Sequence, residues 1–417
     1  MSPLSRAAAA GALSLVLAAP LGTATAAQAA PHLSASAPVA TAGTSMTSAG
    51  TSMTSAGTSM TSAGTSDAAT RIELPRPTGP FALGSDTLHL VDHARRDPWV
   101  PSQDRELMVT LTYPAVRSGT GRPVAYTTQA EAPVLLRRLG VDPARVGDIE
   151  ATTTHARAGV RPARGRHPLI VLSPGFGAPR YSLTTLAEEL ASRGYVVASV
   201  DHAYESVGTS FPGGRLLTCV ACTAMENGTP GSRVTETRAA DVSFLLDRLT
   251  GPHAAWRHAR AIDTSRIGMA GHSIGGAAAV SAMVRDNRIR AGVNMDGAFW
   301  DVLPPEGLGG RPFMMLGTDD ATHRPGGKDR TWDAMWPALD GWKRWLTVAG
   351  AEHMTFSDEP VLAAHFSLER TSLPARRAVP VVRTYVGAFF DQELRGRTRA
   401  VLAGPTAANP EVTFNNP

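Results

Sequence analysis

Lysine is almost absent from this chain, and its scarcity helps to exclude one class of protein. Lys328 and Lys343 are the only two lysines among 417 residues, so arginine supplies nearly all of the positive charge behind a formal net charge of +4. The arginines are scattered, and no basic stripe with interleaved aromatic residues occurs. Such a stripe is the usual footprint of a nucleic-acid-binding protein. We therefore expect no nucleic-acid partner.

Long apolar runs are also missing, except at the N-terminus. There Arg6 precedes an apolar run that ends near Ala19, and Ala27-Gln28-Ala29 fits the rule for signal peptidase cleavage. The run is short for a span of about 20 residues, which disfavours an uncleaved anchor. The sequence predicts a signal peptide over residues 1–29, cleaved between Ala29 and Ala30, and hence a secreted protein.

Large apolar side chains are rare in residues 30–70, where GTSMTSA occurs three times in succession over residues 43–63. Such a segment cannot bury enough apolar surface to offset the entropy lost on ordering. We expect a flexible spacer here, followed by a catalytic domain over residues 71–402 and a flexible tail over residues 403–417.

The only two cysteines form the motif Cys219-Val-Ala-Cys222 in a loop-like stretch. A zinc site needs about four ligands, and no further Cys or nearby His is present to supply them. A thioredoxin-like redox role would require a different surrounding pattern. In an exported protein, the two cysteines are expected to form a small disulfide on a surface loop.

Strand-like and helix-like segments alternate from about residue 71 onward. Two early strands are expected to pair antiparallel, and later strands alternate with helices of 10–15 residues, as in a mostly parallel sheet covered on both faces. The sequence therefore predicts an α/β fold. The expected strands are 87–94, 106–116, 167–177 with its Pro-Gly end, 195–204, 266–271, 289–297, 312–320 and 345–354, and the main helices are 181–194, 238–250, 274–286, 333–345 and 378–394.

A G-x-S-x-G pattern, Gly271 to Gly275 around Ser273, lies between an expected strand and an Ala-rich helix. By itself the pattern is weak, but strand, tight turn and helix form the context in which such a serine acts as a nucleophile. The glycines let the chain turn sharply, and the helix N-terminus favours negative charge. Ser273 is therefore the candidate nucleophile.

A serine hydroxyl needs a base, and in this arrangement the acid and then the histidine follow the serine in the chain. His353 follows the last expected strand, with His323 and His365 as reserves. His272 is an improbable partner, because adjacent side chains diverge on a tight turn. The acid is Asp296, or Asp319 or Asp320 one strand later, and the pattern alone does not separate them.

A tetrahedral oxyanion intermediate needs two hydrogen-bond donors. One is expected from the backbone N–H of Ile274 and the other from the loop at residues 173–177, which ends the third expected strand. Pro174 has no N–H, so Phe176 is the expected second donor.

Several blocks in the order expected of one family resemble the plasma-type platelet-activating-factor acetylhydrolases, which are α/β-hydrolases. These blocks include VLSPGFGAPRYSLTTLAEELASRGYVVASVDH, GHSIGG, NMDGAFW and AEHMTFSD, within about residues 72–395. The resemblance implies Ser273 as nucleophile, Asp296 as acid, His353 as base, and Phe176 and Ile274 as oxyanion donors. The chain departs from the family in its repeat and its CVAC loop.

The sequence thus predicts a secreted serine esterase that cleaves short-chain acyl esters, with sn-2 short-chain phospholipids as one option. A lipase, a polyester hydrolase and a non-catalytic binding protein are the alternatives. Phe299, Trp300 and Met354 are candidate walls of an acyl pocket. We expect no cofactor and no metal, and at most transient contact with a lipid surface. The oligomeric state stays open.

Overall fold

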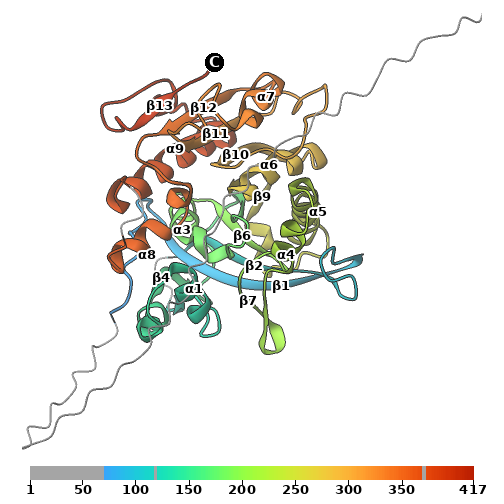
Figure 1. Cartoon of the computed structure of the whole chain (residues 1–417). Helices are drawn as coiled ribbons and strands as arrows, with labels where there is room; N and C mark the ends of the chain where they lie inside the picture. Colours follow the sequence, from blue (N-terminus) through green and yellow to red (C-terminus); the bar gives the residue numbers. More distant parts are fainter. Residues whose placement is uncertain (1–69, 117–119, 369–371) are drawn as a thin grey trace, which may run out of the picture. The chain divides into compact units, whose positions relative to one another are not determined.

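A large twisted sheet organises the computed structural model, which describes residues 70–116, 120–368 and 372–417 (Figure 1). The expected signal peptide and nearly all of the repeat spacer lie outside these residues. Within the described part, eleven strands form the main sheet in the order β13-β12-β11-β10-β9-β5-β6-β2-β1-β4-β3. The strands of this sheet are β1 (Ala82–Arg96), β2 (Asp104–Ala115), β3 (Arg122–Ala125), β4 (Thr153–Ala158), β5 (His167–Ser173), β6 (Val196–His202), β9 (Ile262–His272), β10 (Ile289–Met295), β11 (Phe313–Thr318), β12 (Lys343–Val348) and β13 (Val412–Phe414).

The centre of the sheet is parallel. Strands β6, β5, β9, β10, β11 and β12 pair parallel with their neighbours, whereas β2 pairs antiparallel with both β6 and β1. This arrangement confirms the predicted α/β fold with a mostly parallel sheet.

Helices cover both faces of the sheet, α3 and α9 on one and α5, α6 and α7 on the other (Figure 1). In β5, Leu169 and Val171 pack on the α5/α6 face while Ile170 and Leu172 pack on the α3/α9 face. A strand buried on both faces needs such a continuous apolar run. The helices are α1 (Ala132–Leu139), α2 (Val146–Glu150), α3 (Thr184–Ser192), α4 (Val220–Glu226), α5 (Gly231–Thr250), α6 (Ile274–Arg285), α7 (Arg330–Ala338), α8 (Glu359–His365) and α9 (Ala375–Arg395).

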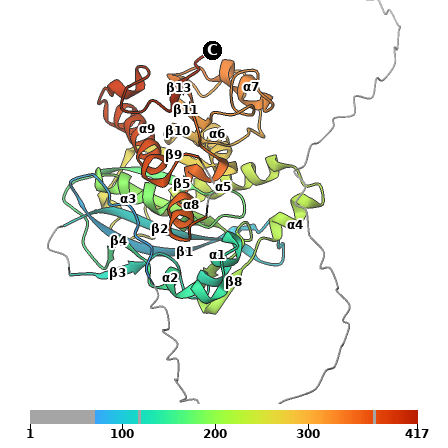
Figure 2. The ribbon, with the colours of Figure 1, turned by 60° about the vertical axis from the view of Figure 1, so that its left-hand side comes forward.

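A smaller layer forms beside strands β1 and β2, where Phe211 packs on Met108 and Arg215 pairs with Glu106. A two-stranded hairpin of β7 (Thr209–Phe211) and β8 (Arg215–Leu217) lies next to α1, and Ser210 N donates to Glu131 at 2.8 Å. Figure 2 shows this hairpin, α1 and α2 on the same side of β1, with α4 beyond them. The CVAC segment, expected to be a loop, starts α4.

Two expectations about the C-terminal third are wrong. Residues 403–417 are not a loose tail, because β13 pairs antiparallel with β12 and Asn415 N donates to Trp345 O at 2.9 Å. The helix expected over residues 333–345 stops at Ala338, and β12 already begins at Lys343. None of the helices in the described ranges is both long and apolar enough to cross a membrane.

Candidate active site

Ser273 lies on a sharp turn between β9 and α6. Its φ is +55°, a left-handed value that an L-residue adopts only under strain. A Cβ on Gly275 would lie 2.2 Å from the carbonyl oxygen of Ser173, so only glycine allows this approach of helix to strand. The backbone is therefore forced into a conformation that presents the serine hydroxyl at the end of the sheet.

A chain of hydrogen bonds joins three residues that follow different strands. Ser273 Oγ lies 3.0 Å from His353 Nε2, and His353 Nδ1 lies 2.6 Å from Asp296 Oδ2. His353 opens the short helix η5 (His353–Phe356) beyond β12, and Asp296, also with positive φ, follows β10. About half of the His353 side chain, 52%, is exposed, so the site is open to solvent.

Asp296 is held as a carboxylate. Burial opposes its ionisation, but the hydrogen bond from His353 and the nearby His323 outweigh that effect and lower the pKa of Asp296 below its usual value. Its other oxygen accepts from Thr318 N at 2.7 Å and lies 3.3 Å from His323 Nδ1. The carboxylate can thus fix the His353 ring and stabilise its protonated form.

The other acids and histidines considered from the sequence have different partners. Asp319 pairs with Arg324 at 2.7 Å, and Asp320 accepts from the backbone of Thr322. His365 lies 3.2 Å from Asp148. Of these alternatives, only His323 touches Asp296, and it does so on the oxygen that His353 does not use.

His272 contacts the backbone of His353 and takes no part in the hydrogen bonds that join Ser273, His353 and Asp296. Its Nε2 donates to the backbone carbonyl of His353 at 2.8 Å, and the two rings lie 4.7 Å apart. Burial, with the neighbouring His353, lowers the pKa of His272 to about 3, so its ring stays neutral. The G-x-S-x-G pattern includes His272, but it does not indicate that this ring contacts the backbone of His353.

The loop after β5, residues 174–177, lies beside Ser273 and is the candidate oxyanion loop, called the oxyanion loop below. A Cβ on Gly175 would lie 3.4 Å from Ser273 Cβ, which places this loop directly beside Ser273. In the described ranges, no acceptor lies within hydrogen-bond distance of the Phe176 N–H. Ile274 is the first residue of α6, so its N–H has no acceptor inside the helix. Both N–H groups are free to bind an oxyanion.

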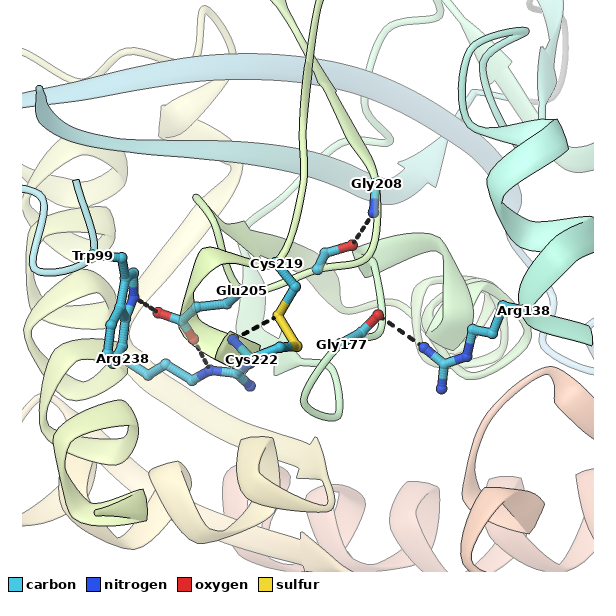
Figure 3. The surroundings of a disulfide bond; sticks show 9 residues. Trp99, Arg138, Gly177, Glu205, Gly208, Cys219, Cys222 and Arg238 are labelled. Carbon is cyan, nitrogen blue, oxygen red and sulfur yellow. Dashed lines mark hydrogen bonds and ion pairs between the residues drawn. A yellow bond between two sulfur atoms is a disulfide. The ribbon is translucent and has the colours of Figure 1, made fainter. Parts of the chain in front are cut away.

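A buried ion pair holds both ends of this loop. Arg238 Nη1 donates to the carbonyl of Pro174 at 2.5 Å, and Arg238 Nε donates to Glu205 at 2.8 Å. The backbone carbonyl of Glu205 in turn accepts from Gly177 N at 2.9 Å. Figure 3 shows the pair, with Trp99 donating to the other oxygen of Glu205. Glu205 therefore links the start of the loop to its end.

A second Ser–His–Asp chain lies beneath the loop. Ser173 Oγ is 3.1 Å from His202 Nε2, and His202 Nδ1 is 2.8 Å from Asp241. All three side chains are buried, so substrate has no access to them. This chain belongs to the support of the loop, because Arg238 also donates to Ser173 Oγ at 3.1 Å.

The disulfide and one cation border the same loop. Cys219 and Cys222 are bonded, as expected, and a Cβ on Gly177 would lie 4.0 Å from Cys222 Sγ. On the other side, Arg138 Nη1 donates to Gly177 O at 2.8 Å and Nη2 lies 3.8 Å from Met354 Sδ (Figure 3). The guanidinium of Arg138 thus spans the gap between the oxyanion loop and the segment that carries His353.

The three expected pocket residues lie in different surroundings. Trp300 is 49% exposed and packs over Gly231, and Met354 is partly exposed beside His353. Phe299 is buried against Phe313 and Trp332, which favours a packing role over a pocket wall.

Sequence reasoning missed the contact of His272 with His353, and it did not find Arg238, Glu205 or Arg138 as neighbours of the site. The contacts of these four residues span from 28 positions (Gly177 to Glu205) to 216 positions (Arg138 to Met354) along the chain, so no local pattern reports them. The fold and this arrangement place the protein among the α/β-hydrolases.

Comparison with known proteins gives the family. The family model of platelet-activating factor acetylhydrolase, isoform II, matches residues 139–212 and 249–376. A probable 1-alkyl-2-acetylglycerophosphocholine esterase of Arthroderma benhamiae is 30% identical over 376 residues, covering 82% of this chain and 93% of the relative. A platelet-activating factor acetylhydrolase of Cavia porcellus is 26% identical over 31% of this chain and 35% of its own.

Among solved structures, a ferulic acid esterase from Streptomyces cinnamoneus is 44% identical and superposes with a TM-score of 0.73, covering 83% of this chain and 99% of that one. The chain belongs to the platelet-activating factor acetylhydrolase family, and it is a carboxylic ester hydrolase.

Proposed function

We propose that this protein is a secreted serine esterase that hydrolyses short-chain acyl esters through an acyl-enzyme on Ser273. The observation that carries the proposal is the hydrogen-bonded chain from Ser273 Oγ through His353 to Asp296. It is supported by the strained turn at Ser273 and by two backbone N–H groups without acceptors beside it.

In the proposed mechanism, Ser273 Oγ attacks the ester carbonyl while its proton passes to His353 Nε2. The carbonyl oxygen becomes an oxyanion held by the N–H groups of Phe176 and Ile274. Collapse of this intermediate breaks the bond to the alcohol, which leaves with the proton from His353. Water then attacks the acyl-enzyme by the same route, releasing the acid and restoring Ser273.

Short-chain acyl substrates, including phospholipids with a short sn-2 chain, follow from the family and its named 1-alkyl-2-acetylglycerophosphocholine esterase relative. The open site, with His353 half-exposed, suits an ester whose alcohol part is large. Phe176 and Met354, which are partly exposed and adjoin Gly175 and His353 in the chain, offer apolar surface beside the candidate site.

A second candidate is the hydrolysis of feruloyl esters. One observation favours it: the ferulic acid esterase structure is more similar in sequence, at 44% identity, than the acetylhydrolase relatives at 30% or less. A feruloyl group is a planar aromatic acid, and the exposed ring of Trp300 is a suitable stacking partner. The two candidates share the mechanism and differ in the acyl pocket.

The test is a rate series on p-nitrophenyl esters from acetate to palmitate, with methyl ferulate and a phospholipid bearing an sn-2 acetyl group beside it. Ser273→Ala is measured on every substrate. A serine-dependent rate that peaks at acetate to butyrate, together with release of acetate from the phospholipid, supports the proposal.

A kcat/KM for methyl ferulate far above that for the short esters would instead establish the second candidate. A maximum at eight carbons or more would indicate a lipase or polyester hydrolase. If Ser273→Ala hydrolysed all substrates as fast as wild type, the proposed mechanism would be wrong.

Secretion is part of the same proposal. It rests on the N-terminal pattern, and the bonded pair Cys219–Cys222 suits an oxidising compartment. The mature protein recovered from culture medium should begin at Ala30, as checked by N-terminal mass spectrometry. A product that keeps residues 1–29 would contradict it.

A further inference from the structure

A cavity of about 590 Å³ lies where the parallel strand β5 begins, whereas Ser273 lies at the ends of the parallel strands. His167, the first residue of β5, lines it, whereas the oxyanion loop follows the last residue of this seven-residue strand. At roughly 3.3 Å per residue, the cavity and the serine are separated by about 20 Å. The cavity is therefore distinct from the ester-cleaving site.

Arginine dominates the charge of this cavity. Six guanidinium groups line it, from Arg166, Arg193, Arg266, Arg395, Arg397 and Arg399. Asp391 is the carboxylate among the lining residues, and it pairs with both Arg395 and Arg399. Arg193 and Arg266 pair with carboxylates outside the lining, at Glu189 and Asp263. Six cations against three carboxylates leave a formal excess of three positive charges.

The excess positive charge is concentrated on side chains that could contact a ligand. Arg166 and Arg397 are exposed, and in the described ranges neither forms an ion pair with a carboxylate. Arg399 Nε is buried and has no hydrogen-bond partner. The same guanidinium pairs with Asp391 through Nη2, but a buried N–H without an acceptor is costly in a folded protein, so Nε points to an absent acceptor.

His167 contains a second buried nitrogen without a hydrogen-bond partner. It is 7% exposed, its Nδ1 donates to the carbonyl of Gly194 at 3.0 Å, and its Nε2 has no partner. With Nδ1 donating, Nε2 of the neutral ring is an acceptor, and the P–O–H group of a hydrogen phosphate or diphosphate would supply the missing donor.

The rest of the cavity is held rigidly. Arg395 donates to the backbone carbonyls of Arg193 and Gly194 at 2.8 and 2.7 Å, and its guanidinium stacks 3.7 Å over the ring of Tyr195. Burial, together with the positive charges of Arg397 and Arg266, lowers the pKa of Arg395. Burial is the larger cause, and the smaller part that comes from Arg397 and Arg266 is repulsion that a bound anion would relieve.

We propose that this cavity binds a multiply charged phosphate-type anion. Guanidinium groups bind phosphate oxygens in pairs with matched geometry. A cavity of about 590 Å³ has room for more than one phosphate group, so a diphosphate is a suitable probe. The phosphate group that binds is either a free anion or part of a lipid headgroup.

Calorimetric titration with inorganic pyrophosphate at low ionic strength tests the site. Wild type should bind, and the double variant Arg166→Glu with Arg397→Glu should bind at least tenfold more weakly. The matched control is Arg233→Glu with Arg285→Glu, which changes the net charge equally at exposed arginines elsewhere. The control should bind within twofold of wild type. Hydrolysis of p-nitrophenyl acetate should be equal in all three proteins, showing that they are folded.

Sedimentation with vesicles distinguishes the two sources. Binding to vesicles that contain phosphatidic acid, but not to phosphatidylcholine alone, with the same dependence on Arg166 and Arg397, identifies a lipid phosphate. Binding of pyrophosphate without vesicle binding identifies a free anion. The proposal is overturned if neither probe binds wild type, or if the control pair weakens binding as much as the cavity pair.

Discussion

At the scale of single residues, position and strain separate the acids that the sequence left open. Asp296 follows β10 with positive φ and contacts His353, whereas Asp320 contacts the backbone of its own turn. A carboxylate that only caps a turn cannot orient the imidazole. The contact with His353, which Asp296 makes and Asp320 does not, therefore decides between the two aspartates.

Asp296→Asn should lower kcat by about 10³ to 10⁴, because the amide favours the wrong tautomer of His353. Asp320→Asn, which is exposed, should stay within a few-fold of wild type. Steady-state rates on p-nitrophenyl acetate measure both. The reverse ranking would move the acid to the turn after β11.

At the scale of elements, three segments meet at the oxyanion loop: the end of β5, the segment after β6, and α5. Arg238 on α5 joins them through Pro174 and Glu205. The pair is buried, and Arg105 also pairs with Glu205 at 2.8 Å, so removing Arg238 leaves Glu205 with one of its two cations and Pro174 O without its donor. The loop should shift when the pair is broken.

Arg238→Met should lower kcat at least tenfold with a smaller change in KM, since a displaced N–H of Phe176 weakens a contact made in the transition state. Arg238→Lys should recover part of the loss. The specific readout is the rate ratio of an ester to its thionoester, whose sulfur binds poorly to such donors. A ratio equal to that of wild type, with only a lowered melting temperature, would limit Arg238 to structural support.

A buried carboxyl at the start of α8 ties this helix to α3. Asp358 accepts from Thr185 Oγ1 at 2.6 Å and from Tyr126 OH at 3.2 Å. Burial nevertheless raises the pKa of Asp358 to about 7. The unfolded carboxyl titrates near its ordinary value of about 3.9. Between these values the folded state holds the extra proton, so this group lowers the free energy of unfolding as pH rises from about 4 to about 7.

Asp358→Asn removes that titration while its amide oxygen still accepts from Thr185. Relative to wild type, the variant should gain a few kcal/mol between pH 5 and pH 8, at about 1.4 kcal/mol per pKa unit. Urea unfolding at both pH values measures the change. Glu226→Gln, at an exposed carboxyl, is the control and should parallel wild type. An Asp358→Asn curve parallel to wild type would show that Asp358 has an ordinary pKa.

At the scale of the whole molecule, the C-terminal strand β13 forms one edge of the main sheet. β13 covers the edge strand β12, and Asn415 and Asn416 complete the hydrogen bonds of Trp345. The active site lies on segments from β5, β9, β10 and β12, so it does not depend directly on β13. The tail should matter for stability more than for catalysis.

A chain that stops after Gly404 should melt several degrees lower, because roughly 1 kcal/mol is lost for each backbone group left unpaired. Its rate at 25 °C should remain close to that of wild type. Thermal unfolding by circular dichroism and a p-nitrophenyl acetate assay measure the two effects. An unchanged melting temperature would mean that residues 405–417 contribute nothing, as a loose tail would.

The sequence by itself determined the α/β class, because strands buried on both faces need continuous apolar runs such as LIVL in β5. It also marked Ser273 and His353 as candidates, since a nucleophile turn and a histidine after a strand are local features. The local pattern did not separate Asp296 from Asp319 and Asp320, which end neighbouring strands, and only the family resemblance favoured Asp296.

Only the tertiary structure decided which residues contact one another across the chain. It brought Asp296 to His353, His272 to the backbone of His353, the Arg238–Glu205 pair to the oxyanion loop and residues 412–414 to the edge of β12. It also gathered arginines from positions 166 to 399 around one cavity. Each of these is a contact between segments far apart in the chain, and such contacts are set by how the strands are ordered in the sheet, which local patterns do not encode.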